Sequence, residues 1–400
     1  MSKPKQILLI GEYYAPIVDW LKNDAKPQGV PAIYNFYNYL GNSDAVQFSS
    51  IIYNPEINKT ISFPNGSTIE LKKFYFPGYY LWKAIVFLKL YFWGKNKIKK
   101  NNYDLVYGFS TFSTVAHFLG KKSNIKSAGR ILGTILTKDF TRGNFFKIYT
   151  RYFFDVLAMK YPCDYVITTM DGSGYDKVFP HFNKNMKIHL LANGMEEKMR
   201  SRLLAIENVK KITREEPIHL CYVARLEEYK RVDRGLYLVK ELIDKHGLTN
   251  IRFTILGAGS KEQILKELSN QLGLTKYVEF LPAIAHEELP NFLATQHVGM
   301  FFYQGGSIGN ILWETGMSGR LVLTIDNGDT GVVFKDVLNC LIAAEDDDFI
   351  SNMADKFAGI LDEDISKITT SARNTVSGYV GTWEDRFDRE LDIIFPPREG

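Results

Sequence analysis

The sequence has 400 residues, of which 45% are hydrophobic and 24% charged, a composition typical of globular proteins with about two domains of this size. Its formal net charge is +4, and without a dominant basic tract this balance does not indicate a nucleic-acid-binding protein. Cys163, Cys221 and Cys340 are far apart, which argues against a disulfide framework and a zinc cluster. The N-terminus lacks the apolar region of a signal peptide, so we expect a cytoplasmic protein.

Short apolar runs in the first half predict buried strands that alternate with helices, the pattern of a doubly wound α/β domain. The runs lie at residues 6–11, 45–53, 68–74, 103–109, 130–134, 164–169 and 187–191. Gly29 precedes a stretch with apolar residues at helical spacing. It either faces a ligand at the start of that helix or merely turns the chain.

The segment Tyr79–Lys100 combines seven aromatic residues with six lysines. It is too interrupted by lysine to span a bilayer. Two interpretations remain open: a helix that is buried or contacts a partner, and an interfacial segment that inserts aromatic rings into a membrane while its lysines meet anionic headgroups.

The second half repeats the alternation of strand and helix. Apolar runs at 219–224, 251–256, 278–281 and 298–303 predict strands, and the polar stretch 196–216 is expected to be a linker. We therefore predict two Rossmann-like doubly wound parallel-sheet domains facing a cleft, at 1–200 and 201–380, followed by a helix within 381–400. The Gly257-Ala258-Gly259 turn lacks the third glycine of GxGxxG, which disfavours a dinucleotide site.

A glycine loop follows the strand at 298–303 and reads GGSIGNILWETGMSG from Gly305. Glycines allow the backbone to approach a ligand closely, and a helix that opens near Asn310 would direct its N-terminal N–H groups at an anion. Glu314 lies about one turn further along, where its carboxylate can accept hydrogen bonds from a sugar diol. By itself this pattern is also ordinary turn chemistry.

The order of these features resembles the retaining nucleotide-sugar glycosyltransferases of the GT-B fold, family 4, of the group 1 type. The resemblance rests on Arg225 and Lys230, the GAG turn, VEFLPAIAHEELPNFLA and HVGMFFYQGGSIGNILWETGMSGRLVLT. It extends more weakly to Gln28-Gly29 and to Ala192-Asn193-Gly194-Met195. The Trp383 helix is similar to the one that, in this fold, crosses back to the N-terminal domain.

The resemblance implies a role for each matching residue. Arg225 and Lys230 would be the catalytic cations that hold the donor diphosphate and stabilise the charge of the departing nucleotide. Glu314 would hold the ribose. The other donor-binding residues would be Gly306, Ser307, Ile308, Gly309, Asn310, Gly257, Gly259 and Gly29.

Two departures from the family pattern stand out. Gly306 occupies the position of the first Glu of the two-Glu motif, which in the family contacts the donor sugar. The histidine expected near Arg130 is also absent, and His117 lies in a helical stretch where a packing role is favoured. Arg130 could instead add charge to the cleft and Asp139 could orient an acceptor hydroxyl, although both residue types also form plain ion pairs.

These features predict a retaining glycosyltransferase that moves a hexose from a nucleotide diphosphate sugar, expected to be a UDP-sugar, to a glycan or lipid-linked glycan acceptor bound by the first domain. No metal and no cofactor are expected. One alternative is a catalytically impaired GT-B protein that binds the nucleotide sugar and regulates or recruits an active partner, and another is a sugar-nucleotide epimerase. We expect a cytoplasmic protein, peripheral at the inner face of the membrane if Tyr79–Lys100 contacts lipid.

Overall fold

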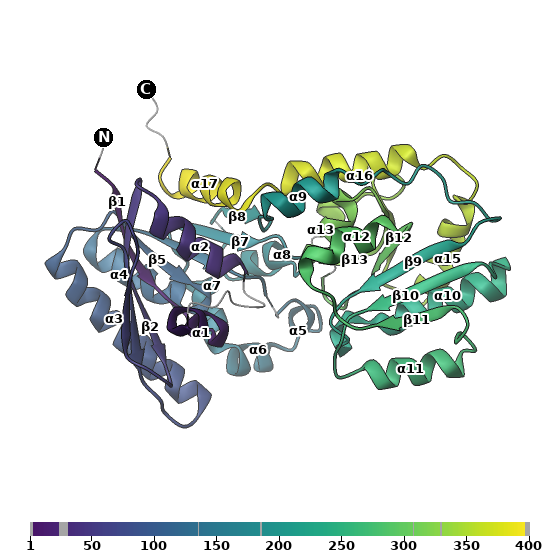
Figure 1. The fold of residues 1–400 in the computed structure, drawn as a ribbon. Coiled ribbons are helices and arrows are strands. Elements are labelled where there is room, and N and C mark those ends of the chain that lie inside the picture. Colours follow the sequence, from purple (N-terminus) through teal and green to yellow (C-terminus); the bar gives the residue numbers. More distant parts are fainter. Residues whose placement is uncertain are drawn as a thin grey trace. The chain divides into compact units, whose positions relative to one another are not determined.

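The computed structural model describes residues 3–23, 31–134, 136–184, 186–306, 308–328 and 330–396. The chain forms two compact α/β units (Figure 1). The first comprises Met1–Thr169, Tyr175–Gly194 and Trp383–Gly400, and the second Met170–Gly174 and Met195–Thr382. The second unit thus starts before residue 201, because the expected linker opens with a helix, α9 (Glu197–Leu204), that contacts helices of the second unit.

The first unit contains an eight-stranded sheet in the order β3-β4-β2-β1-β5-β6-β7-β8. All neighbouring pairs are parallel except the antiparallel β3–β4 pair. Its strands are β1 (Lys5–Ile10), β2 (Val46–Asn54), β3 (Lys59–Ser62), β4 (Thr68–Lys73), β5 (Leu105–Phe109), β6 (Lys126–Ile131), β7 (Tyr165–Thr169) and β8 (Ile188–Leu191). Its α-helices are α1 (Ala15–Asn23), α2 (Pro31–Asn42), α3 (Tyr79–Lys100), α4 (Ser113–Ser123), α5 (Thr137–Thr141), α6 (Phe145–Arg151), α7 (Phe153–Lys160), α8 (Tyr175–Val178) and α17 (Trp383–Ile394).

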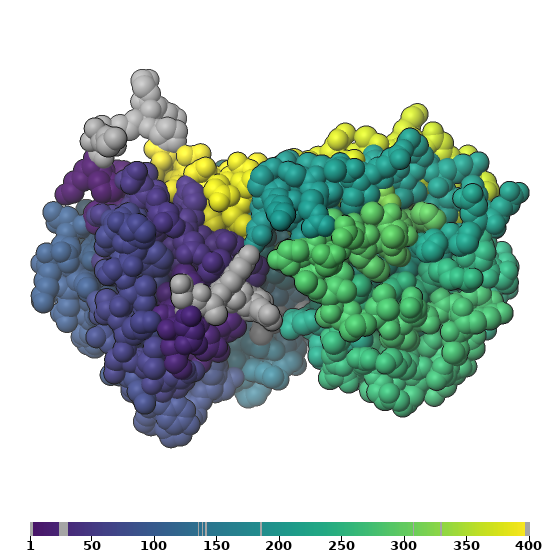
Figure 2. All heavy atoms as spheres, viewed as in Figure 1, coloured from purple at the N-terminus to yellow at the C-terminus, as the bar shows by residue number. Residues whose placement is uncertain are grey.

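Helices cover both faces of this sheet, which explains why its strands are continuous apolar runs. Along β1, Ile7 and Leu9 pack in one cluster with side chains of α1, α2 and α17. Leu8 and Ile10 pack on the opposite face with side chains of α3 and α4. The C-terminal helix α17 therefore belongs to the core of the first unit, and Figure 2 shows its yellow atoms against the purple N-terminal helices.

The second unit contains a six-stranded parallel sheet in the order β11-β10-β9-β12-β13-β14. Its strands are β9 (Ile218–Val223), β10 (Ile251–Leu256), β11 (Val278–Leu281), β12 (Val298–Phe301), β13 (Leu321–Asp326) and β14 (Leu341–Ala344). Besides α9, its α-helices are α10 (Val232–His246), α11 (Glu262–Gln271), α12 (Leu289–Ala294), α13 (Asn310–Met317), α14 (Thr330–Val333), α15 (Phe349–Gly359) and α16 (Ser366–Tyr379). Short 3-10 turns also occur, among them η1 (Ser110–Phe112), η3 (Glu228–Lys230) and η4 (His286–Glu288).

The strand order of the second unit reverses at β9. From β9 the chain adds β10 and β11 on one side, and it then returns to place β12, β13 and β14 on the other. In open parallel sheets, ligands bind outside the carboxyl ends of the strands at such a reversal. The loops that follow β9 and β12 are therefore the place to look for a site.

Candidate functional site

Two predicted cations lie in the loop after β9. Arg225 follows the strand directly, and Lys230 ends the turn η3. Burial, and secondarily the charge of Arg225, lowers the pKa of the Lys230 ammonium group from 10.5 to about 8. In the described part of the chain this ammonium has no acidic partner, and it sits 3.7 Å from the centre of the Tyr303 ring. Two neighbouring cations, of which Lys230 has no acidic partner among the described residues, favour an anion at this place.

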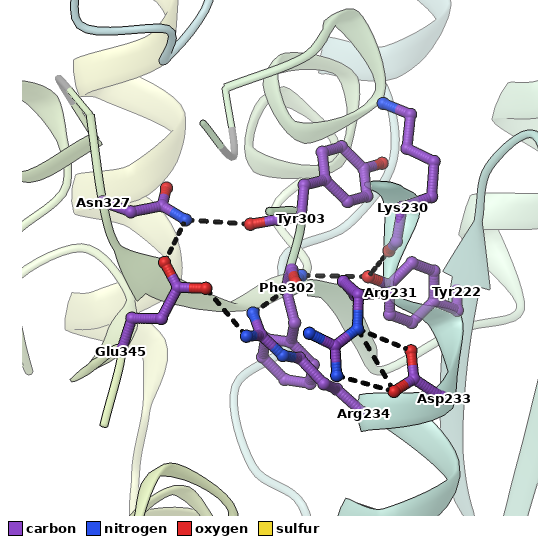
Figure 3. A network of polar contacts seen from close by, with 9 residues as sticks. All are labelled: Tyr222, Lys230, Arg231, Asp233, Arg234, Phe302, Tyr303, Asn327 and Glu345. Atoms are coloured by element: carbon purple, nitrogen blue, oxygen red, sulfur yellow. Dashed lines mark hydrogen bonds and ion pairs between the residues drawn. The ribbon is translucent and has the colours of Figure 1, made fainter. Parts of the chain in front are cut away.

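The backbone that carries Lys230 is fixed to the loop after β12. The Tyr222 hydroxyl donates a 2.6 Å hydrogen bond to the Lys230 carbonyl and accepts a 3.0 Å bond from the Phe302 N–H (Figure 3). The Gln304 N–H donates to the Tyr229 carbonyl at 2.9 Å. These bonds fix the backbone of Lys230 relative to the loop after β12 before any ligand arrives.

Further polar contacts hold the carbonyl groups of the loop after β12. Arg234 donates to the Phe302 carbonyl at 2.9 Å and pairs with Glu345 at 2.7 Å. The Asn327 amide donates to the Tyr303 carbonyl at 2.8 Å and to Glu345 at 3.2 Å (Figure 3). The described acids of this network are thus engaged by residues other than Lys230.

The glycine loop opens α13 as predicted, because the helix begins at Asn310 with Gly309 as its N-cap. Gly309 approaches the Tyr303 ring to 3.7 Å, measured from its ideal Cβ position. The same ring touches Lys230. The N-terminus of α13, where backbone N–H groups favour an anion, therefore lies one aromatic ring away from the cationic pair. The side chain of Ile308 is buried.

Glu314 lies inside α13 and is 4% exposed. Its Oε1 is 2.7 Å from Nε2 of His286, which is the first residue of η4. The hydrogen bond with Glu314 is the main cause that raises the pKa of His286 above 6.5. Glu314 also contributes to the raised pKa of Tyr303, after burial and Tyr229. Its carboxylate is therefore close to the tyrosine that contacts Lys230.

Gly306 has a steric reason to be glycine. Its φ is +147°, and an added Cβ would lie 2.2 Å from the carbonyl oxygen of Gly172. The same oxygen would be 1.7 Å from a Cβ at Gly328. Residues 170–174 thus pack against the glycine loop within the second unit. The missing first Glu of the family motif is replaced here by a close backbone contact.

Gly257 and Gly259 also permit close backbone packing. A Cβ at Gly257 would lie 1.9 Å from the Ala224 carbonyl oxygen, and one at Gly259 would lie 2.4 Å from that of Leu226. These two glycines hold the loop that carries Arg225 against the end of β10. Two other predicted donor-binding residues, Gly29 and Ser307, lie outside the described residues.

The expectation that Arg130 adds charge to a ligand cleft is wrong, because its side chain is fully buried in the first unit. It stands over the rings of Phe36 and Phe387 at 5.2 and 5.5 Å and is 3.8 Å from Glu390 on α17. Burial alone would raise the pKa of Glu390, but Arg130 and Arg386 together hold it below its ordinary value.

The two other side chains weighed for this region also have partners. Asp139 is 8% exposed and pairs with Lys147 at 2.8 Å. His117 Nδ1 is 2.6 Å from the Pro162 carbonyl oxygen, which agrees with a packing role.

Sequence reasoning missed three residues of the candidate site: Tyr229, His286 and Tyr303. Tyr229 accepts a 2.6 Å hydrogen bond from Arg225. The Tyr303 ring contacts Lys230, and His286 is hydrogen-bonded to Glu314. The signal available was position alone, since all three follow strands at the carboxyl edge of the sheet. In the described part of the chain no three His, Cys, Asp or Glu side chains are grouped to hold a metal ion.

Part of the chain matches a described protein family. Residues 205–370 match the family described as Glycosyl transferases group 1. Among proteins with curated functions, none matches the sequence.

Solved structures match over almost the whole chain. Sucrose-phosphate synthase from Thermosynechococcus elongatus is 14% identical over 97% of this chain and 98% of its own, with a TM-score of 0.64. The lipopolysaccharide outer core galactosyltransferase WaaB is 14% identical over 98% and 99%, with a TM-score of 0.66. HepE from Anabaena, in complex with UDP and glucose, is 12% identical over 97% and 99%, with a TM-score of 0.58.

Likeness at these identities establishes the fold, and the predicted GT-B arrangement of two parallel-sheet α/β units is confirmed. The match to glycosyl transferases group 1 covers most of the second unit, which carries Arg225, Lys230 and Glu314.

Proposed function

We propose that this protein is a retaining, metal-independent glycosyltransferase that moves a hexose from a UDP-sugar to the hydroxyl group of a glycan or lipid-linked glycan. The proposal is carried by two cations, Arg225 and Lys230, beside the N-terminus of α13; among the described residues no acid pairs with Lys230. A nucleoside diphosphate carries the negative charge that would pair with these cations.

The chemistry follows from charge development. As the bond between the sugar and the diphosphate breaks, negative charge grows on the leaving phosphate. A fixed cation stabilises that charge more in the transition state than in the ground state, which lowers the barrier. Lys230 is suited to this role because its loop is already positioned by Tyr222. No further cofactor is needed for this step.

Glu314 is proposed to hold the ribose. Its carboxylate is buried and hydrogen-bonded to His286, so a ribose diol would share or replace a bond that already exists. The choice of UDP is supported by HepE, which is described with UDP and glucose. A hexose is supported by WaaB, which is described as a galactosyltransferase. The first unit is proposed to bind the acceptor.

One observation favours a second candidate, a GT-B protein that binds the nucleotide sugar and acts through a partner. Position 306, where the family has a sugar-contacting Glu, is filled by glycine, and the Gly172 carbonyl occupies the space of a side chain. Such a protein would bind the donor but would not transfer the sugar.

The two candidates are separated by measuring UDP release and UDP binding together. We expect wild-type protein to release UDP from UDP-glucose or UDP-galactose, and Lys230→Ala to lose both release and binding. Lys240→Ala, an exposed lysine of α10 that pairs with Asp244, is the matched control. Binding without turnover across a panel of UDP-sugars and acceptors would support the second candidate. NMR of the anomeric proton of the product tests retention.

A further inference from the structure

Helix α3 exposes large apolar side chains that the core of the first unit does not use. Its buried face consists of Val86, Leu90 and Gly94, together with Lys83. On the opposite face Leu88 is 61% exposed and Phe92 is 59% exposed. The helix is therefore part of the core on one face, and the membrane interpretation of Tyr79–Lys100 stays a prediction about its open face.

Neighbouring helices continue this exposed apolar surface. On α6, Phe146 is 82% exposed. Other exposed apolar and aromatic side chains of the same region are Tyr79, Tyr80, Leu81, Phe118, Phe145, Tyr149, Phe153 and Tyr161. We call the exposed side chains of α3, α4, α6 and α7, with Tyr161 directly after α7, the aromatic surface.

Contacts between the helices show that the aromatic surface is continuous. The Tyr80 hydroxyl at the start of α3 donates a 3.0 Å hydrogen bond to the Arg151 carbonyl at the end of α6. The rings of Phe118 on α4 and Tyr161 after α7 lie 5.3 Å apart. An apolar groove between α3 and α4 is lined by Leu88 and Phe118 among others. All of these residues belong to the first unit.

The same helices concentrate positive charge. Residues 79–100 carry six lysines and no acid, and residues 137–160 carry five basic and two acidic residues. Eleven basic and two acidic residues give these segments a formal charge of +9, whereas the whole chain has +4. Lys121 and Lys122 of α4 are exposed beside the apolar groove. The remainder of the chain is therefore net acidic.

We propose that the aromatic surface docks on an anionic phospholipid bilayer, such as the inner leaflet of a cell membrane. Exposed aromatic and leucine side chains would enter the boundary between headgroups and acyl chains, and the surrounding lysines would meet lipid phosphates. Among the described residues none of the helices has the length and apolar character to cross a bilayer, so the contact is peripheral.

Charge argues against a second copy of the chain as the occupant, because two such surfaces would bring an excess of positive charge against another. A single-stranded nucleic acid also binds cations and aromatic rings. The exposed rings of this surface could stack on bases, but its exposed leucines, Leu81 and Leu88, cannot, and they suit acyl chains. The partner with both features is an anionic lipid surface.

Vesicle sedimentation tests this proposal without using the donor site. We expect wild-type protein to pellet with vesicles of phosphatidylcholine and phosphatidylglycerol, to do so less at high salt, and to stay in solution with phosphatidylcholine alone. Leu88→Ser/Phe146→Ser removes two exposed apolar side chains and should weaken binding by about tenfold or more. Lys95→Glu/Lys99→Glu should weaken it and reduce its salt dependence.

Matched controls lie in the second unit. Tyr237→Ser removes a side chain that is 42% exposed on α10, and Lys198→Glu/Lys276→Glu reverses two charges there, so both should bind vesicles as wild type does. Thermal stabilisation by UDP shows that a variant is folded and that its donor site is intact, independently of vesicle binding. It should be unchanged in every variant. The proposal would be overturned if wild-type protein did not bind anionic vesicles, or if the surface variants bound them as tightly as wild type. It would also be overturned if the protein bound an oligonucleotide in place of vesicles.

Discussion

Replacing Lys230 by methionine is expected to stabilise the free protein while abolishing its response to UDP. Burial and Arg225 lower the pKa of this lysine from 10.5 to about 8, so holding the charged form in the folded state is unfavourable. At about 1.4 kcal/mol for each unit of pKa, the difference corresponds to about 3.5 kcal/mol. Lys230 keeps partial contact with water, and screening reduces the expected effect to about 1–2 kcal/mol.

The sign follows from proton linkage. Below pH 8 the lysine is protonated in both the folded and the unfolded chain, so the full penalty is present. Between pH 8 and 10.5 the unfolded chain binds more protons than the folded one, and stability rises with pH. At pH 7, Lys230→Met should therefore raise the free energy of unfolding by about 1–2 kcal/mol, because methionine fills similar space without the charge.

Urea denaturation at pH 7 measures this gain, and a thermal shift with UDP measures the loss of ligand response. Lys240→Met should change neither by much, since an exposed ion pair contributes less than about 1 kcal/mol. UDP affinity of the wild type should also weaken as pH rises through about 8, because the neutral amine attracts a diphosphate less. A Lys230→Met protein that is less stable than wild type, or that UDP still stabilises as strongly, would refute the reasoning.

Three further predictions concern other contacts. NMR titration should give His286 a pKa above 6.5, and this pKa should fall in Glu314→Gln. The stability that the His286–Glu314 pair contributes is full below pH 6.5 and is lost as pH rises through the pKa of the folded state. An unchanged pKa in the variant would contradict the pairing. Glu390→Gln should lower the free energy of unfolding by about 3–5 kcal/mol in urea, because it leaves two buried guanidinium groups uncompensated; a loss below about 1 kcal/mol would show that water reaches them. Gly305→Ala and Gly306→Ala both place a side chain at positive φ, a strain of about 1–2 kcal/mol, but only the Cβ of Gly306→Ala would lie 2.2 Å from a carbonyl oxygen. Gly306→Ala should therefore unfold more easily and respond more weakly to UDP than Gly305→Ala. Equal effects of the two substitutions would exclude the steric reason.

Local pattern was sufficient to predict most strands. Residues 7–10 of β1 are completely buried on both faces, and a strand covered on both faces must be apolar throughout. The start of α13 was also predictable, since glycine is among the residues accepted at an N-cap and Gly309 precedes an apolar stretch.

Contacts between residues far apart in the sequence were not predictable in this way. Arg130 ends a strand, a position typical of ligand-binding residues, but its counter-charge Glu390 comes from the other end of the chain. Without that partner, the sequence offers no reason to place a guanidinium in a core. The same holds for Glu314, whose partner His286 belongs to a different loop.

The difference between these two buried charges bears on function. Glu390 is held by Arg130 and Arg386, and its pKa is lower than ordinary in spite of burial, so the group is compensated within the fold. The carbonyl of Lys230 is held by the Tyr222 hydroxyl, yet no described acid pairs with its ammonium group, and burial displaces its pKa toward the neutral form. A cation that the fold positions but does not neutralise is available to pair with an anionic ligand. For that reason the uncompensated lysine, more than the better-paired charges of the core, locates the site.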